Sequence, residues 1–197
     1  MNKLQGFWEL KTLILPSVPW ERYTGSQTLD KNKLWTVRVA VLKGNDFNLP
    51  RKVGVTADEA EAFARNLLKT LGKNDLVIYY PYFIAQKSGT LQVDYSRTVI
   101  EGVDKDLWNL LTHNRRDITV IQEKGETNIY GDKNFFAPEE LEELFGAAEY
   151  IRRRYRSAFI SDGPILLEWS YAQETDISRN PIGEPRLVFI EMKTVRR

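Results

Sequence analysis

The sequence predicts an α+β fold in which a mainly antiparallel sheet is flanked by helices. Residues 56–71 and 138–156 repeat apolar side chains every three or four positions, which is the pattern of an amphipathic helix. Two later apolar runs, residues 165–172 and 186–195, are joined by a polar loop and are expected to pair as antiparallel strands. These two kinds of element set the expected fold class.

Length and charge limit the classes of function. The chain has 197 residues, which suits one domain or one domain with two lobes. It carries 28 basic and 27 acidic residues, so a net charge of +1 gives no general attraction to nucleic acid or to an anionic membrane. With 42% hydrophobic residues the chain is expected to be globular rather than disordered.

Residue types exclude several kinds of site. The absence of cysteine excludes disulfides, thiolate chemistry and sulfur-ligated metals, and a single histidine, His113, excludes a multi-histidine zinc site within one chain. A site in which carboxylates hold a hard cation remains possible. No apolar stretch approaches the ~18 residues of a membrane span, so we expect a cytoplasmic protein with no membrane partner.

The first third of the chain divides at residue 33. Residues 1–33 show no sustained period and are expected to form a docking arm or an irregular first layer, ahead of a main domain at 34–197. Residues 34–42 alternate between apolar and polar positions, which predicts a strand with Arg38 on its polar side. A loop is expected over 43–51. The aromatic residues of the first segment are Phe7, Trp8, Trp20 and Tyr23.

The middle third combines one helix with several strands. Thr56 and Glu59 form the capping box of the helix at 56–71, which Gly72 can end. Residues 75–85 form an apolar run that is expected to cross the interior and become irregular at Pro81. Further segments are expected as one or two strands at 90–103 after a Ser88-Gly89 turn, a short helix at 106–113, and a hairpin at 117–132 turning at Lys124-Gly125.

The last sixty residues carry paired charges. The helix at 138–156 opens with glutamates and closes with arginines, which complements its dipole. Because side chains alternate along a strand, Glu191 and Lys193 are expected on the face of Leu187 and Phe189. By the same rule Glu168 shares a face with Leu166 and Ser170. A glutamate in an apolar strand needs a partner, which could be a metal ion, a phosphate-linked cation or Lys193.

This helix, followed by LLEWSYA (166–172) and FIEMKTV (189–195), resembles the nucleotide-binding, ATP-grasp part of the phosphoenolpyruvate synthase and pyruvate phosphate dikinase family. The resemblance implies that Glu168 matches the family's metal-binding and catalytic glutamate. Glu191 stands where the family has glutamine and Lys193 where it has arginine. Glu168 and Glu191 are thereby implied as metal ligands.

The resemblance continues upstream. LWTVRVAV (34–41) is similar to a strand whose arginine contacts nucleotide phosphates, and Arg38 matches that arginine. LVIYYPYFIAQKSGTL (76–91) resembles the hinge beside the adenine, so Tyr80, Pro81 and Tyr82 are implied to border the base. VIEGV (99–103) resembles the following strand with its acidic residue, Glu101.

The family resemblance implies an ATP-grasp-like domain that binds ATP or a related nucleotide with Mg²⁺, with phosphoryl transfer to an unidentified acceptor. Arg38 and Lys193 would hold the phosphates. No phosphohistidine domain or phosphoenolpyruvate-binding barrel follows Arg197, so we expect either that a protein partner supplies the acceptor or that the chain is a reduced member with another role.

Structural alternatives stand beside these roles. Glu191 and Lys193 could simply form exposed cross-strand salt bridges. The tyrosines at 79–82 could simply fill a hydrophobic core instead of lining a pocket. His113 could simply end a short helix. A different class of function is a noncatalytic interaction module, which would dock a protein or nucleic acid through the aromatic first segment and the basic residues 152–156.

Overall fold

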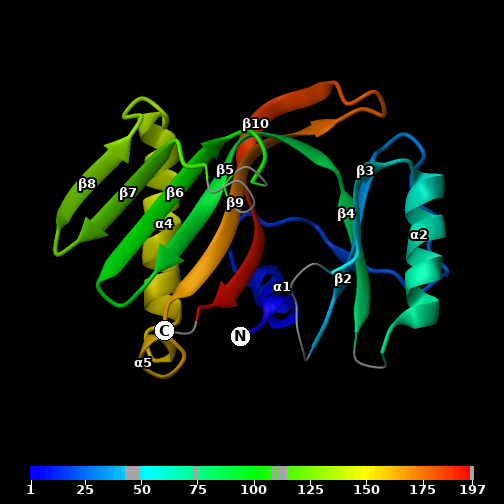
Figure 1. Ribbon diagram of the computed structural model, residues 1–197, viewed down its shortest axis with the longest axis horizontal. Coiled ribbons are helices and arrows are strands. Elements are labelled where there is room, and N and C mark those ends of the chain that lie inside the picture. Colours follow the sequence, from blue (N-terminus) through cyan, green and yellow to red (C-terminus); the bar gives the residue numbers. More distant parts are fainter. Residues whose placement is uncertain (43–48, 73–74, 108–109, 111–114, 196–197) are drawn as a thin grey trace.

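The computed structural model describes residues 1–42, 49–72, 75–107, 110 and 115–195, and within them the chain forms an α+β fold with two antiparallel sheets (Figure 1). One sheet has the strand order β1-β4-β2-β3 and the other β10-β9-β5-β6-β7-β8. The helices are α1 (Lys3–Thr12), α2 (Ala57–Thr70), α4 (Pro138–Arg154) and α5 (Ala158–Ser161). The strands are β1 (Glu21–Arg22), β2 (Trp35–Ala40), β3 (Arg51–Val55), β4 (Leu76–Pro81), β5 (Phe83–Val93), β6 (Arg97–Asp104), β7 (Ile118–Glu123), β8 (Glu126–Gly131), β9 (Ile165–Thr175) and β10 (Pro181–Thr194).

Helix α2 covers one face of the four-stranded sheet. Val37 and Val39 of β2 pack in one buried cluster with Ala60 and Ala64 of the helix. The opposite face of the sheet contributes Ile78 and other residues to a separate cluster between the sheets. Strand β2 is therefore buried on both faces, and Arg38 lies on the face away from α2.

Helix α4 covers the six-stranded sheet. Leu144 and Ile151 pack with Leu91, Leu167 and Trp169 in the largest core of the molecule. Side chains alternate in a strand, so the neighbours of these core residues point away from α4. That second face carries the buried polar residues Ser88, Thr90, Glu168 and Ser170.

The first segment is not the irregular layer that the sequence predicted, because residues 3–12 form helix α1. Asn2 caps this helix and Gln5 completes the capping box. Leu4 and Phe7 are buried between β10 and the four-stranded sheet. The short apolar face of a ten-residue helix gives a weak periodic signal, which explains why the segment was predicted as irregular.

The residues after α1 connect the two sheets. The Val18 amide donates to the Phe189 carbonyl of β10 at 3.1 Å, and the Phe189 amide donates to Pro16 at 2.8 Å. The chain then forms β1, which pairs with β4 in the other sheet. The first segment is therefore part of the core and of both sheets.

Most predicted elements are confirmed, with changes at their ends. Helices α2 and α4 and the β7–β8 hairpin, whose turn contains Lys124 and Gly125, lie where expected. The chain leaves β4 at Pro81 and enters the other sheet at Phe83. The predicted Ser88-Gly89 turn is wrong, because both residues lie inside β5. Most of the predicted helix at 106–113 and most of the loop at 43–51 lie outside the described residues.

None of the described helices has the length and apolar character that crossing a membrane requires.

Candidate functional site

A cleft of about 1070 Å³ lies between the two sheets. Its size and position identify it as the main candidate site, since ligand pockets are concave and combine apolar walls with a few polar groups. The four-stranded sheet contributes Thr36, Arg38, Val53 and Tyr80. The six-stranded sheet contributes Ser88, Glu168, Ser170, Gln173, Pro181 and Lys193, and α1 contributes Lys3.

A bulge in β10 turns two charged side chains toward this cleft. Phe189 pairs with Trp169 and Glu191 pairs with Glu168, so Ile190 is an extra residue in the ladder. One extra residue reverses the faces of everything beyond it. Leu187 and Phe189 consequently pack on the α4 side, whereas Glu191 and Lys193 share the face of Glu168. The prediction that Glu191 and Lys193 share a face with Leu187 and Phe189 is therefore wrong.

Five charged side chains meet beside the cleft, and we call them the ion cluster: Lys3, Arg38, Glu168, Glu191 and Lys193. All of them except the buried Glu191 line the cleft. Arg38 Nη2 donates to Glu191 Oε2 at 3.2 Å. Lys3 Nζ and Lys193 Nζ lie 3.3 and 3.5 Å from Glu191 Oε1. Lys193 Nζ also lies 3.8 Å from Glu168 Oε1.

The ion cluster is buried rather than a surface feature. Glu191 is 1% exposed, Glu168 is 8% exposed and Arg38 is 9% exposed. The alternative of exposed cross-strand salt bridges is therefore wrong for Glu191. Removing charged groups from water is costly unless each group has a partner, so the cluster depends on its internal pairing.

The two carboxylates differ in their protonation behaviour. Burial opposes ionisation of Glu191, but Arg38, Lys3 and Lys193 outweigh it and lower the pKa of Glu191. Burial raises the pKa of Glu168, and the neighbouring charge of Glu191 raises it further. Glu191 is thus the firmly ionised member of the pair.

The charge of the cluster is positive. Three cations and two carboxylates sum to +1 when both carboxylates are ionised, and to +2 when Glu168 holds a proton. Burial alone would lower the pKa of Arg38, yet Tyr80 and the two glutamates raise it, so the guanidinium keeps its charge. A buried excess of positive charge favours an anionic ligand.

The segment predicted to border a base lies at the connection between the sheets. Tyr80 is buried beside Arg38, and burial raises the pKa of its hydroxyl. Tyr82 lines the cleft, and its amide donates to the Leu34 carbonyl at 2.8 Å. Pro81 is the last residue of β4 and lies opposite Trp35.

Glu101 lies outside the ion cluster. Its Oε1 pairs with Arg116 Nε at 2.6 Å, and its Oε2 accepts from the Thr90 hydroxyl at 3.3 Å. Glu101 and Glu168 both lie opposite Thr90 in the sheet, so strand β5 separates them.

Metal-binding groups are limited to a pair. Within the described residues no three or more Asp, Glu, His or Cys side chains gather as a metal site. Glu168 and Glu191 are direct neighbours across β9 and β10. Two carboxylates could hold Mg²⁺ only together with ligands from a substrate or water, which is the usual arrangement for this ion.

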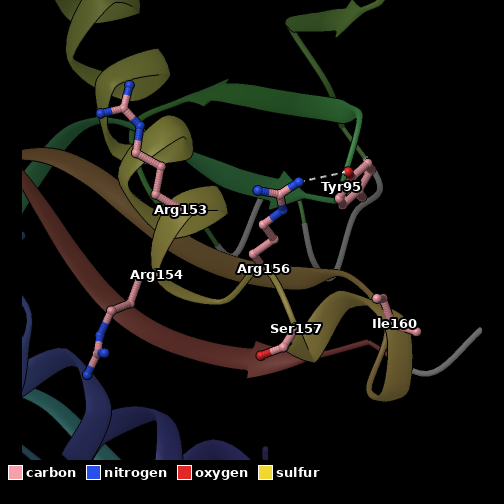
Figure 2. Close-up of a pocket in the computed structure, with 6 residues that line it drawn as sticks. All are labelled: Tyr95, Arg153, Arg154, Arg156, Ser157 and Ile160. Carbon is pink, nitrogen blue, oxygen red and sulfur yellow. Dashed lines mark hydrogen bonds between the residues drawn. The ribbon is translucent and has the colours of Figure 1, made fainter.

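The features that would serve an interaction module do not converge. Phe7, Trp20 and Tyr23 of the first segment are buried, although Trp8 is half exposed. Arg153, Arg154 and Arg156 at the end of α4 point in different directions (Figure 2). Arg153 pairs with Glu149, and Arg156 Nη2 donates to the Tyr95 hydroxyl at 3.4 Å.

Lys3 is the residue of the cluster that the sequence did not predict. It reaches Glu191 only because α1 forms and lies against β10. The signal that could have identified the helix is Asn2-x-x-Gln5, since this spacing is that of a capping box.

Comparison with known proteins gives a limited result. No protein-family model matches the sequence, and no curated protein matches it. Among solved structures, the macrocyclase MdnC from Microcystis aeruginosa MRC, solved bound with the precursor peptide MdnA, is similar with a TM-score of 0.46 and 6% identity. The similarity covers 96% of this chain and 51% of that chain, so this chain spans about half the length of the macrocyclase.

Proposed function

We propose that the protein binds ATP or a related nucleotide with Mg²⁺ in the cleft between the sheets, as a reduced ATP-grasp-like domain. The observation that carries the proposal is the ion cluster, in which one buried and two partly buried cations outnumber two buried carboxylates beside the cleft. A nucleotide supplies the negative charge that this cluster lacks.

The residues present fit the ligand. Lys3, Arg38 and Lys193 would hold phosphate oxygens, since ammonium and guanidinium groups are the usual phosphate-binding groups of proteins. The volume of about 1070 Å³ is at the upper end of small-molecule sites, which suits a nucleotide. Tyr80, Pro81 and Tyr82 would lie near the base, at the connection between the sheets.

The carboxylates fit one metal ion held jointly with the nucleotide. Glu191 is already engaged by three cations, whereas the cation nearest Glu168 lies at 3.8 Å. Glu168 would therefore be the principal protein ligand and Glu191 the secondary one. Bound Mg²⁺ would neutralise phosphate charge and align the transferred group. Glu101 would act on the nucleotide from outside the cluster.

The reaction that we propose is phosphoryl transfer to an acceptor carried by a protein partner. In such a reaction the protein mainly positions the phosphates and stabilises charge. Arg38 and Lys193 would stabilise the charge that develops on the transferred group, and Glu168 would position it through the metal. The cytoplasmic location stays a prediction.

A thermal-shift titration with ATP, ADP and GTP, with and without Mg²⁺, tests the proposal. A ligand that binds only the folded state stabilises it by about 2.7 kcal/mol at a hundredfold excess over Kd. We expect a nucleotide-specific, Mg²⁺-dependent rise in Tm. No shift at millimolar nucleotide would contradict the proposal and favour the interaction module.

The variant Glu168→Gln tests the metal site. We expect it to abolish Mg²⁺-dependent nucleotide binding with little loss of stability, because the amide keeps the shape of the side chain without its charge. Glu174→Gln is the matched control, since Glu174 lies on the same strand and pairs with Arg186 at the surface. Unchanged nucleotide affinity in Glu168→Gln would remove Glu168 from the metal site.

A further inference from the structure

The β9–β10 hairpin extends beyond its own sheet toward the other wall of the cleft. In Figure 1 the hairpin leaves the six-stranded sheet and reaches toward β3. Arg179 in its tip (residues 176–180) makes the contact, because its Nη2 donates to the Gly54 carbonyl at 3.1 Å. The same guanidinium lies 5.9 Å from the ring centre of Tyr82.

Hydrogen bonds within the hairpin tip fix its conformation independently of its contact with β3. Asp176 Oδ1 accepts the amides of Ser178 and Asn180, each at 2.8 Å, and Oδ2 accepts the Asn180 side chain. Arg179 has a φ of 64°, a conformation that favours glycine and that this network maintains. The tip therefore presents Arg179 in a fixed direction.

The receiving strand is also shaped for the contact. Trp35 pairs with Val55 and Val37 pairs with Lys52, so β3 has one extra residue opposite β2. Gly54 lies in this bulge with a φ of 63°. A bulge leaves part of the ladder unpaired, and the Gly54 carbonyl is thereby able to accept from Arg179.

Both partners adjoin exposed residues that line the cleft and mark its opening: Gly54 follows Val53, and Arg179 lies two residues before Pro181. Val53 and Tyr82 line the cleft beside Gly54, and Gln173 and Pro181 line it from the base of the hairpin. We propose that the β9–β10 hairpin is a clasp over this opening, with the hydrogen bond from Arg179 to Gly54 as its latch, and that the latch controls access to the cleft. The proposed function is needed only to say that the ligand is a nucleotide.

Hydrogen exchange on the full chain tests the latch without any ligand. In Arg179→Ala we expect exchange in residues 51–55 and 176–183 to rise at least about threefold, because one hydrogen bond that holds them is lost. Exchange in α4 should not change. Arg186→Ala is the control, because Arg186 pairs with Glu174 within the hairpin and is exposed. Equal exchange at 51–55 in wild type and Arg179→Ala would overturn the clasp.

Nucleotide kinetics test the control of access. With a fluorescent ATP analogue and Mg²⁺, stopped-flow measurement should show association and dissociation both several-fold faster in Arg179→Ala than in wild type and Arg186→Ala. Unchanged rates would refute control of access even if the hydrogen bond exists. A wild-type protein that binds no nucleotide would refute the proposed function, whereas the exchange result would still decide whether the clasp exists.

Discussion

Glu168 and Glu191 are neighbours in one buried cluster, but their charges should affect stability in opposite directions. The lowered pKa of Glu191 means that the folded state favours its ionised form. The raised pKa of Glu168 means that the folded state favours its protonated form. Each therefore has its own pH range in which it stabilises the fold.

Glu191→Gln should lower the free energy of unfolding by about 3 kcal/mol at pH 7, because it leaves one buried and two partly buried cations without their shared partner. The stabilisation from Glu191 is present above its unfolded pKa of 4.5 and is lost as the pH falls through the lower folded value. The difference in the free energy of unfolding between variant and wild type should become smaller below pH 4.5. Urea unfolding from pH 3 to pH 8 measures it, and a constant difference would contradict the pairing.

Glu168→Gln should behave in the opposite way. The contribution of Glu168 is fully present below its unfolded pKa of 4.5 and is lost as the pH rises through the raised folded value. The variant should therefore gain stability relative to wild type as the pH increases, since glutamine has no charge to bury. The same urea series tests this, and a relative loss of stability toward high pH would show that Glu168 is ionised without cost.

At the scale of residues, sequence reasoning identified four of the five members of the ion cluster. Glu168, Glu191 and Lys193 were recognisable because charged residues inside apolar strands require partners. Arg38 was expected on the polar side of its strand, and only the family resemblance implied a role for it. The sheet face on which Glu191 and Lys193 lie was not predictable. The bulge at Ile190 interrupts the alternation of side chains from which that face was inferred. Glu101 pairs with Arg116, and its place near the nucleotide stays a prediction.

At the scale of elements, helix α1 depends on a glycine. A Cβ on Gly6 would lie 1.6 Å from the Met192 carbonyl oxygen, so the helix can lie against β10 only without a side chain there. This close approach places Lys3 within 3.3 Å of Glu191. One small residue thereby determines whether the third cation reaches the cluster.

Gly6→Ala should destabilise the protein by at least about 2 kcal/mol, because α1 must move away from β10. Gly146→Ala is a matched control on α4, where a Cβ meets nothing within 4 Å, and it should stabilise by about 0.5 to 1 kcal/mol. Urea unfolding of both variants measures the contrast. A neutral Gly6→Ala would mean that α1 does not need this close packing.

Helices α2 and α4 were predicted from the sequence, whereas α1 was not, because its capping box was its main local signal. Both long helices combine a wide apolar face with charged first and last turns, so local signals agree. In α1 the packing against β10 and the four-stranded sheet provides most of the stabilisation, and that packing is invisible in a local pattern. The pairing of β10 with Pro16 and Val18 is invisible for the same reason.

At the scale of the whole molecule, the first segment packs against and pairs with both sheets, so we expect it to couple their unfolding. Phe7 is fully buried, contacts Trp20 edge to face at 5.8 Å, and lies 5.3 Å beneath the Arg38 guanidinium. Its cluster includes residues of both sheets. Antiparallel pairing within each sheet was expected from the sequence, but the division into two sheets was not. Pro81 indicated where the apolar run breaks, yet no local signal showed that β4 and β5 enter different sheets.

Phe7→Ala should cost about 3 to 4 kcal/mol and should weaken the coupling between the sheets. For wild type, the calorimetric and van't Hoff enthalpies of unfolding should be equal. For the variant, the calorimetric enthalpy should exceed its own van't Hoff enthalpy. Leu67→Ala is the control, since among the described residues the buried cluster that contains Leu67 includes none from the six-stranded sheet. Two-state unfolding of Phe7→Ala would show that other contacts couple the sheets.

The pairing of the first segment with β10 also orders events during biosynthesis. Arg38 and Glu191 are 153 residues apart in sequence, and Val18 pairs with Phe189. Protein synthesis adds about 5 to 20 residues per second, so Glu191 is synthesised many seconds after Lys3 and Arg38. On the ribosome α1 therefore has no β10 to pack against, and the binding cleft assembles only after translation has passed that strand.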